Sequence, residues 1–198
     1  MFLQKKLKNM KNVFIISGPA GSGKDAVIDG LCKLLPLTRV ITTTTRAPRR
    51  GETEGHPYYF ISRQEFEQAI ARKKFIEYST NENDELYGVT SEELDRIAHS
   101  ENIGIWKVDW KGVVSAKKLF PGIIALFINA PLDVLESRLR KRDASKANDD
   151  YFRERMEYTR EWLKHTDIYD SIIENEQGKL DEAIQKIFAI IKERTTTV

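Results

Sequence analysis

The sequence predicts an α/β fold in which a parallel β-sheet is flanked by helices. The short apolar runs Val13–Ile16 and Ile123–Ile128 lack polar–apolar alternation, which indicates strands covered on both faces. Segments of helical periodicity alternate with such runs, the order typical of parallel strands joined by helices. With 198 residues and 40% hydrophobic content, the chain is long enough for one core, so we expect a single domain over residues 1–198.

The individual elements follow from local signals in chain order. Pro36 stops the first helical pattern, Ser62 and Glu65 have the order of a capping box, and Pro131 suits the first turn of a helix. The sequence thus predicts a strand at 13–16, a helix at 25–35, an extended segment at 39–45, a helix from Ser62, a helix at 91–100, a strand at 103–108, a helix at 113–119, a strand at 123–128, a helix at 131–142, a helix at about 150–165, a strand at 171–173 and a helix at 180–191.

Changes in composition divide the chain. Residues 45–90 contain many charges and aromatics but few long apolar runs, and residues 143–150 are polar and weakly patterned. We therefore expect a core of about 11–44, 91–141 and 156–193, an inserted segment of about 45–90, and a short lid of about 142–155. We expect Thr195–Thr197 to be a disordered tail.

Composition and charge exclude several classes of protein. The 32 Lys and Arg nearly balance the 30 Asp and Glu, so the net charge of +2 gives no indication of a nucleic-acid partner. The longest strongly apolar stretch is far shorter than the about 20 residues of a membrane helix, and the basic N-terminus has no apolar signal-peptide core. The single cysteine, Cys32, cannot form an internal disulfide. We expect a cytoplasmic protein with no membrane partner; its oligomeric state is not predicted.

A glycine-rich loop lies between the first strand and the first helix. It fits G-x-x-x-x-G-K and consists of Gly18, Pro19, Ala20, Gly21, Ser22, Gly23 and Lys24. In that context backbone N–H groups and the helix N-terminus can bind phosphates, and Lys24 can reach the β- and γ-phosphates of a nucleotide. The sequence therefore predicts a P-loop type of α/β fold.

Asp25 stands where this pattern usually has Ser or Thr. A carboxylate is a hard oxygen ligand, so Asp25 is a candidate Mg²⁺ ligand. The alternative is an acidic residue favoured by the N-terminus of a helix.

Two arginines follow the second extended segment. Arg46 and Arg49, with Pro48 between them, can form a planar double clamp for a phosphate, and Tyr58 can add a hydroxyl donor. The alternative is a solvated basic turn.

Together these motifs resemble the guanylate kinase family, which phosphorylates GMP to GDP with ATP. The matching elements are T-T-R-x-P-R at Thr44–Arg49, G-E-x-x-G-x-x-Y at Gly51–Tyr58, F-I-E at Phe75–Glu77, Y-G at Tyr87–Gly88, D-x-x-G at Asp109–Gly112 and V-I-x-N at Ile172–Asn175. Ordered matches extend from about Val13 to Ile191.

The resemblance implies roles for individual residues. GMP would be bound by the inserted segment and its surroundings, through Thr42, Arg46, Arg49, Tyr58, Glu77, Tyr87, Thr90 and Asp109. Within this set, Glu77 and Asp109 would bind guanine, because carboxylates accept from its N1–H and N2–H₂ groups. Lys24, Arg142 and Arg155 would act on the transferring phosphoryl group, with Arg153 as the alternative to Arg155. ATP would be bound by the loop, Lys24, Asp25 and Asn175, with Mg²⁺ as cofactor; dGMP is a further candidate substrate.

Besides Asp25, two positions depart from the family pattern. Val89 stands where Ser or Thr usually follows Tyr-Gly, and Thr90, one residue later, either contacts guanine or caps the next helix with Glu93. Lys107 replaces a frequent acidic residue. It could neutralise Asp25, meet a phosphate, or reach solvent at the end of a strand.

Two other functions remain as alternatives. The ribose 1,5-bisphosphate phosphokinase family is similar to this chain at Gly23–Asp25 and Tyr87–Val89, but it does not share the Arg49–Tyr58 stretch. A non-catalytic guanylate-kinase-like binding module usually lacks the phosphate-binding loop, which is intact here.

Overall fold

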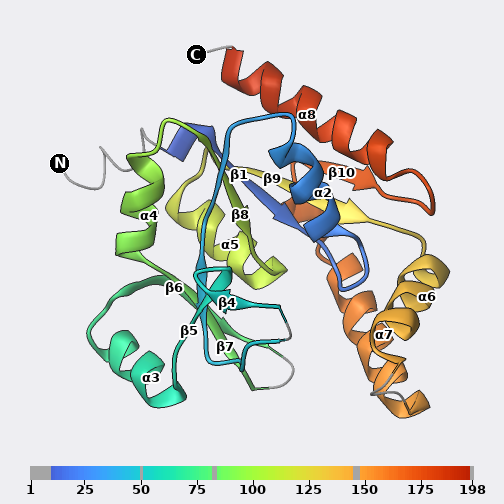
Figure 1. Cartoon of the computed structure of the whole chain (residues 1–198), viewed down its shortest axis with the longest axis horizontal. Helices are drawn as coiled ribbons and strands as arrows, with labels where there is room; N and C mark the ends of the chain where they lie inside the picture. The colour runs from blue at the N-terminus through green and yellow to red at the C-terminus, as the bar shows by residue number, and fades with distance from the viewer. Residues whose placement is uncertain (1–9, 50, 82–83, 145–147, 197–198) are drawn as a thin grey trace.

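The computed structural model describes residues 10–49, 51–81, 84–144 and 148–196 (Figure 1). In chain order the elements are η1 (Met10–Asn12), β1 (Val13–Ser17), α2 (Lys24–Cys32), β2 (Leu37–Arg39), β3 (Thr42–Thr44), β4 (Thr53–Glu54), β5 (Pro57–Phe60), α3 (Arg63–Ala71), β6 (Phe75–Thr80), β7 (Leu86–Thr90), α4 (Ser91–Ala98), β8 (Ile103–Lys107), α5 (Trp110–Leu119), β9 (Ile124–Asn129), α6 (Leu132–Arg142), α7 (Asp149–Leu163), η3 (Thr166–Ile168), β10 (Ser171–Glu174) and α8 (Leu180–Thr196).

The central sheet has five parallel strands in the order β10-β9-β1-β8-β2. Helices α2 and α8 cover one face and α4 and α5 the other (Figure 1). Strand β1 is buried along its whole length, as its continuous apolar run predicts, because Phe14 and Ile16 face α2 and α8 while Ile15 faces the opposite layer. The predicted α/β fold is confirmed.

A second five-stranded sheet lies beside the first, in the order β4-β5-β3-β7-β6. It is mixed, since β3 pairs with β5 in parallel but with β7 in antiparallel orientation. The extended segment expected at 39–45 is therefore divided: Leu37–Arg39 belongs to the central sheet and Thr42–Thr44 to the second. The second sheet begins before residue 45, and the sequence did not predict it as a sheet.

Several element ends differ from those predicted. Helix α2 ends at Cys32, earlier than Leu35, while α8 continues to Thr196, so the disordered tail expected at 195–197 is wrong for its first two residues. Thr197 lies outside the described residues. So do residues 145–147 of the expected lid and residues 50, 82 and 83 of the inserted segment.

Local capping confirms one sequence signal directly. The hydroxyl of Ser62 accepts from the backbone N–H of Glu65 at 3.2 Å, and the Glu65 carboxylate accepts from the backbone N–H of Ser62 at 2.8 Å. This capping box fixes the start of α3.

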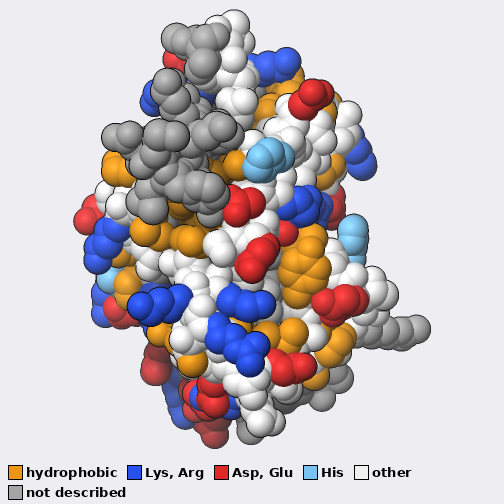
Figure 2. Space-filling view, turned by 90° about the vertical axis from the view of Figure 1, so that its left-hand side faces the viewer, with side chains coloured by type: hydrophobic (Ala, Val, Ile, Leu, Met, Phe, Trp, Pro, Cys, Tyr) orange, Lys and Arg blue, Asp and Glu red, His pale blue; other side chains and the backbone are white. Residues whose placement is uncertain are grey.

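The surface on the side of α3 and α4 carries cationic and anionic side chains interspersed with one another (Figure 2). Within the described ranges, no helix combines the length and the apolar character that crossing a bilayer would require.

Candidate active site

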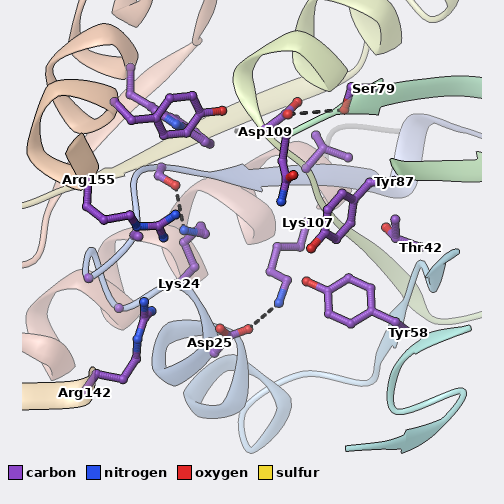
Figure 3. Close-up of a pocket in the computed structure, with 18 of the residues that line it drawn as sticks. Lys24, Asp25, Thr42, Tyr58, Ser79, Tyr87, Lys107, Asp109, Arg142 and Arg155 are labelled. Atoms are coloured by element: carbon purple, nitrogen blue, oxygen red, sulfur yellow. Dashed lines mark hydrogen bonds and ion pairs between the residues drawn. The ribbon is translucent and has the colours of Figure 1, made fainter. Parts of the chain in front are cut away.

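A cavity of about 430 Å³ opens between the glycine-rich loop, the second sheet and the helices α6 and α7 (Figure 3). Its walls bring together residues from distant parts of the chain. The predicted site residues among them are Gly18, Ala20, Gly21, Gly23, Lys24, Asp25, Thr42, Arg49, Tyr58, Glu77, Tyr87, Asp109, Arg142 and Arg155. Pro19, Ser22, Arg46, Thr90 and Asn175 are not on these walls.

The glycine-rich loop connects β1 to the N-terminus of α2. Gly23 is the N-cap residue, with a φ of 89°, and a Cβ atom there would overlap the side-chain amide of Asn175, so glycine is required. Among the described residues no side chain caps α2, which leaves its first N–H groups available to an anion. The Ser22 hydroxyl is buried without a hydrogen-bond partner among the described residues. The loop therefore has the features of a phosphate-binding site.

Lys24 extends from the first turn of α2 toward this loop. Its Nζ donates to the carbonyl oxygens of Gly18 at 2.6 Å and Pro19 at 2.9 Å. Burial, and then repulsion from Lys107, Arg142 and Arg155, lower the pKa of Lys24 to about 7. An entering phosphate would stabilise its charged form.

Asp25 is paired with Lys107 across the cavity. The Lys107 Nζ, at the end of β8, donates to Asp25 Oδ1 at 2.7 Å. Partial desolvation at the cavity wall acts against this, but the neighbouring Lys107 ammonium group lowers the pKa of the exposed Asp25 carboxyl. The structure thus pairs Lys107 with Asp25, the first of the three alternatives for this lysine.

The residues expected to bind the acceptor phosphate form two layers. Thr42, Arg49, Tyr58 and Tyr87 line the cavity, with the rings of Tyr58 and Tyr87 edge to face at 5.9 Å. Arg46 lies behind them, its guanidinium carbon 5.3 Å from the Tyr58 ring centre.

Arg46 is held by Glu52, a residue for which we predicted no role. Its Nη2 donates to the two Glu52 carboxylate oxygens at 2.9 and 2.8 Å, and Arg46 is only 7% exposed. Glu52 also accepts from the backbone N–H of Arg49 at 2.7 Å. Glu52 thus holds both arginines of the expected double clamp in one loop. Arg49 faces the cavity, and Arg46 is held behind it.

Two carboxylates lie at the far end of the cavity. Glu77 on β6 is 7% exposed, and burial, reinforced by repulsion from Asp109, raises its pKa to about 8. Burial also raises the pKa of Asp109, which accepts from the Ser79 hydroxyl at 3.3 Å and the Gly112 backbone N–H at 2.7 Å. The latter bond makes Asp109 the N-cap of α5. This acidic end suits a ligand with clustered N–H donors.

Thr90 and Val89 do not belong to the cavity wall. The Thr90 hydroxyl caps α4 by accepting from the Glu93 backbone N–H at 3.2 Å, and Val89 is fully buried in the core. The Glu93 carboxylate accepts instead from the Ile41 backbone N–H at 2.6 Å, so the capping box is only half formed. The geometry favours the capping alternative for Thr90.

Three predicted arginines lie on α6 and α7. Arg142 and Arg155 line the cavity and extend toward Lys24 (Figure 3). Arg142 also forms a bidentate salt bridge with Asp143, at 2.9 and 2.8 Å. This salt bridge and the hydrogen bond from the Tyr151 hydroxyl lower the pKa of Asp143 to about 2. Arg153 pairs with Asp150 on the exposed face, which supports Arg155 as the second lid arginine.

Asn175 lies behind the loop at a second hollow of about 520 Å³. Its side-chain N–H₂ donates to the Ser22 carbonyl at 2.7 Å, and its Oδ1 is buried with no partner among the described residues. Arg138, which separates the two hollows, donates to the Gly21 carbonyl at 3.2 Å and the Asn175 carbonyl at 3.1 Å.

Several cavity residues were not predicted as site residues: Ser79, Asn81, Arg138, Tyr158 and Trp162. Arg138 lies four positions before Arg142 on the same helix, so helical spacing could have identified it. Ser79, two positions after Glu77 on a strand, points to the same side and carried a similar signal.

Comparisons with known proteins agree with this geometry. A family model described as guanylate kinase matches residues 10–194. The chain is 34% identical over 187 residues to a guanylate kinase of Rickettsia felis, covering 93% of this chain and 95% of the relative. It is 31% identical over 188 residues to one of Methylococcus capsulatus, covering 94% and 90%. A crystal structure of guanylate kinase from Anaplasma phagocytophilum has the same fold, with a TM-score of 0.69 and 23% identity over 91% of this chain and 85% of that one.

Proposed function

Since the chain belongs to the guanylate kinase family of phosphotransferases, we propose that it transfers the γ-phosphoryl group of ATP to GMP with the help of Mg²⁺. The observation that carries the proposal is one cavity lined both by Lys24 at a phosphate-binding loop and by the carboxylates of Glu77 on β6 and Asp109 at the start of α5. A triphosphate and a guanine could therefore be held facing each other.

At the donor end, the ATP phosphates bind the loop between Gly18 and Lys24. The second hollow, beside Asn175 and Arg138, accepts the adenine side. Asn175 lines this hollow, which agrees with its expected place on the adenine side.

At the acceptor end, Glu77 and Asp109 accept hydrogen bonds from the guanine N1–H and N2–H₂ groups. Adenine has an unprotonated N1, so it would leave a buried carboxylate unpaired, and such sites discriminate by about 10⁴-fold. Arg49, Tyr58 and Tyr87 bind the GMP phosphate, and Arg46 supports Tyr58 from behind.

Asp25 is the residue that would hold Mg²⁺. In phosphoryl-transfer sites this ion takes one or two protein carboxylates and fills its remaining positions with phosphates and water, so a single carboxylate in the first turn of α2 fits. Bound there, Mg²⁺ would neutralise charge on the transferring phosphates.

The chain's own contribution is alignment and charge neutralisation. The attacking GMP phosphate oxygen is already anionic, so no general base is needed. Arg142 and Arg155 extend toward Lys24 (Figure 3), so that three cations would surround the transferring phosphoryl group, and closure of the lid would exclude water that otherwise hydrolyses ATP.

The test is ADP release from ATP and Mg²⁺ with GMP, dGMP, AMP, CMP, UMP and ribose 1,5-bisphosphate. Turnover with GMP, alone or with dGMP, supports the proposal. Turnover only with the sugar bisphosphate would favour the alternative kinase. If no acceptor supports turnover and calorimetry detects no ATP·Mg²⁺ binding, a non-catalytic binding module is favoured.

A further inference from the structure

Lys107 occupies the middle of the cavity, where the donor and acceptor ends meet. Its side chain is 21% exposed, and its Nζ lies 2.7 Å from Asp25 Oδ1 on the donor side. The same nitrogen lies 5.3 Å from the centre of the Tyr58 ring on the acceptor side. Figure 3 shows the ammonium group between these two residues. Of the groups expected to bind the acceptor phosphate, Tyr58 is therefore within immediate reach of Lys107.

The pairing of Lys107 with Asp25 neutralises a negative charge beside the phosphate-binding loop. A carboxylate adjacent to Lys24 would repel the phosphates that this loop is built to bind. Lys107 cancels that charge while the cavity is empty. Asp25 is 67% exposed, so solvent weakens the ion pair and its exchange for another anion costs little.

We propose that Lys107 is a binding residue for the acceptor phosphate, and that Asp25 holds its ammonium group in place until that phosphate arrives. This inference rests on the proposed function, because GMP supplies the phosphate. A phosphate bound by Arg49, Tyr58 and Tyr87 carries more charge than the Asp25 carboxylate. It therefore draws the ammonium group away from Asp25 by a movement of the flexible lysine side chain.

The test is calorimetric titration with GMP and with guanosine, in the absence of ATP and metal. Lys107→Gln should weaken GMP binding about tenfold, the loss expected for one charge-assisted hydrogen bond. Guanosine has no phosphate, so its affinity should be unchanged. Lys118→Gln, on the exposed end of α5, is the matched control and should alter neither affinity.

Asp25→Asn provides the second variant. It frees Lys107 from its counterion, so GMP binding should tighten by about threefold or more. In the double variant this gain, measured relative to Lys107→Gln alone, should be smaller, because no ammonium group remains to be freed. A gain at least as large as in the wild-type background would mean that Asp25 acts only by repelling the phosphate, which would overturn the exchange.

Two further outcomes would overturn the inference. An equal loss of GMP and guanosine affinity in Lys107→Gln would assign the lysine a structural role only. Unchanged GMP affinity would show that it does not meet the phosphate. If wild-type protein turns over GMP, either result leaves the proposed function intact; failure of the wild type to bind or phosphorylate GMP would refute that function instead.

Discussion

The two ends of the cavity shift the pKa values of their ionisable groups in opposite directions. At the loop, burial and neighbouring cations lower the pKa of Lys24 to about 7. At the end expected to bind guanine, burial and Asp109 raise the pKa of Glu77 to about 8. In the empty site, near neutral pH, each group is thus partly or largely in its uncharged form. A bound ligand of complementary chemistry favours the charged form. The two ends should therefore respond in opposite ways to substitution and to pH.

Removal of the donor-end cation should have the largest effect. Lys24→Ala deletes the side chain that reaches the β- and γ-phosphates, and we expect kcat to fall about 10³-fold. Steady-state ADP release with saturating GMP measures this. Lys33→Ala, on the exposed C-terminal end of the same helix, serves as the control. Comparable losses in both variants would show that α2 had been damaged generally.

Substitution of Glu77, at the end of the cavity expected to bind guanine, should alter the selectivity between GMP and AMP. Glu77→Gln places an N–H₂ group among the guanine N–H donors, so kcat/KM for GMP should fall about 10²-fold relative to that for AMP. Competing GMP and AMP turnover measures the ratio, and Glu182→Gln on α8 is the surface control. An unchanged ratio would remove Glu77 from base recognition.

The lid arginines should give a smaller effect at the donor end. Arg142→Gln leaves one fewer cation beside the transferring phosphoryl group, and we expect kcat to fall by about 10–100-fold with little change in GMP affinity. Arg153→Gln, whose arginine pairs with Asp150 outside the cavity, should retain activity. A loss of comparable size in Arg153→Gln would favour the alternative in which Arg153 acts in place of Arg155.

A change of one pH unit should have the smallest effect, and its sign should be opposite at the two ends of the cavity. ATP binding favours charged Lys24, so above about pH 7 it requires proton uptake and its affinity should fall as pH rises. Guanosine binding favours ionised Glu77, so its affinity should increase as pH rises from 6 toward about 8. A single proton limits each change to about tenfold per pH unit. Calorimetry in buffers of different ionisation enthalpy would detect the proton uptake and release. If the affinities for ATP and guanosine changed in the same direction with pH, the contrast between the two ends of the cavity would be contradicted.

The same contrast explains how much the sequence could predict. Strand β1 and the loop after it depend on local signals: an apolar run, glycines at fixed spacing, and a lysine. The strands β4 and β5 are short and partly exposed, with no clear periodicity. Strand β4 pairs with β5, and the pairing of β5 with β3 depends on contacts between separate segments of the chain. The second sheet was therefore recognised only as a change in composition.

Individual site residues show the same limit. The motif identified Arg46 and Arg49 but not which of them faces the cavity, because that depends on Glu52. Lys107 was recognised as a departure, yet its partner Asp25 lies 82 positions away and only folding selects it. The expectations of a cytoplasmic location and of no nucleic-acid partner stay predictions.

The helix-capping bond of Asp109 has a consequence for engineering. Gly112 is required there, since a Cβ atom would approach the Val108 Cβ to 2.9 Å, and the Asp109 carboxylate fixes the start of α5. Replacing Asp109 to admit a different base would also cost about 1 kcal/mol of stability through the lost cap. Glu77, in the middle of strand β6, caps no helix. Redesign of nucleotide selectivity should therefore begin at Glu77, because a substitution there does not remove a helix cap.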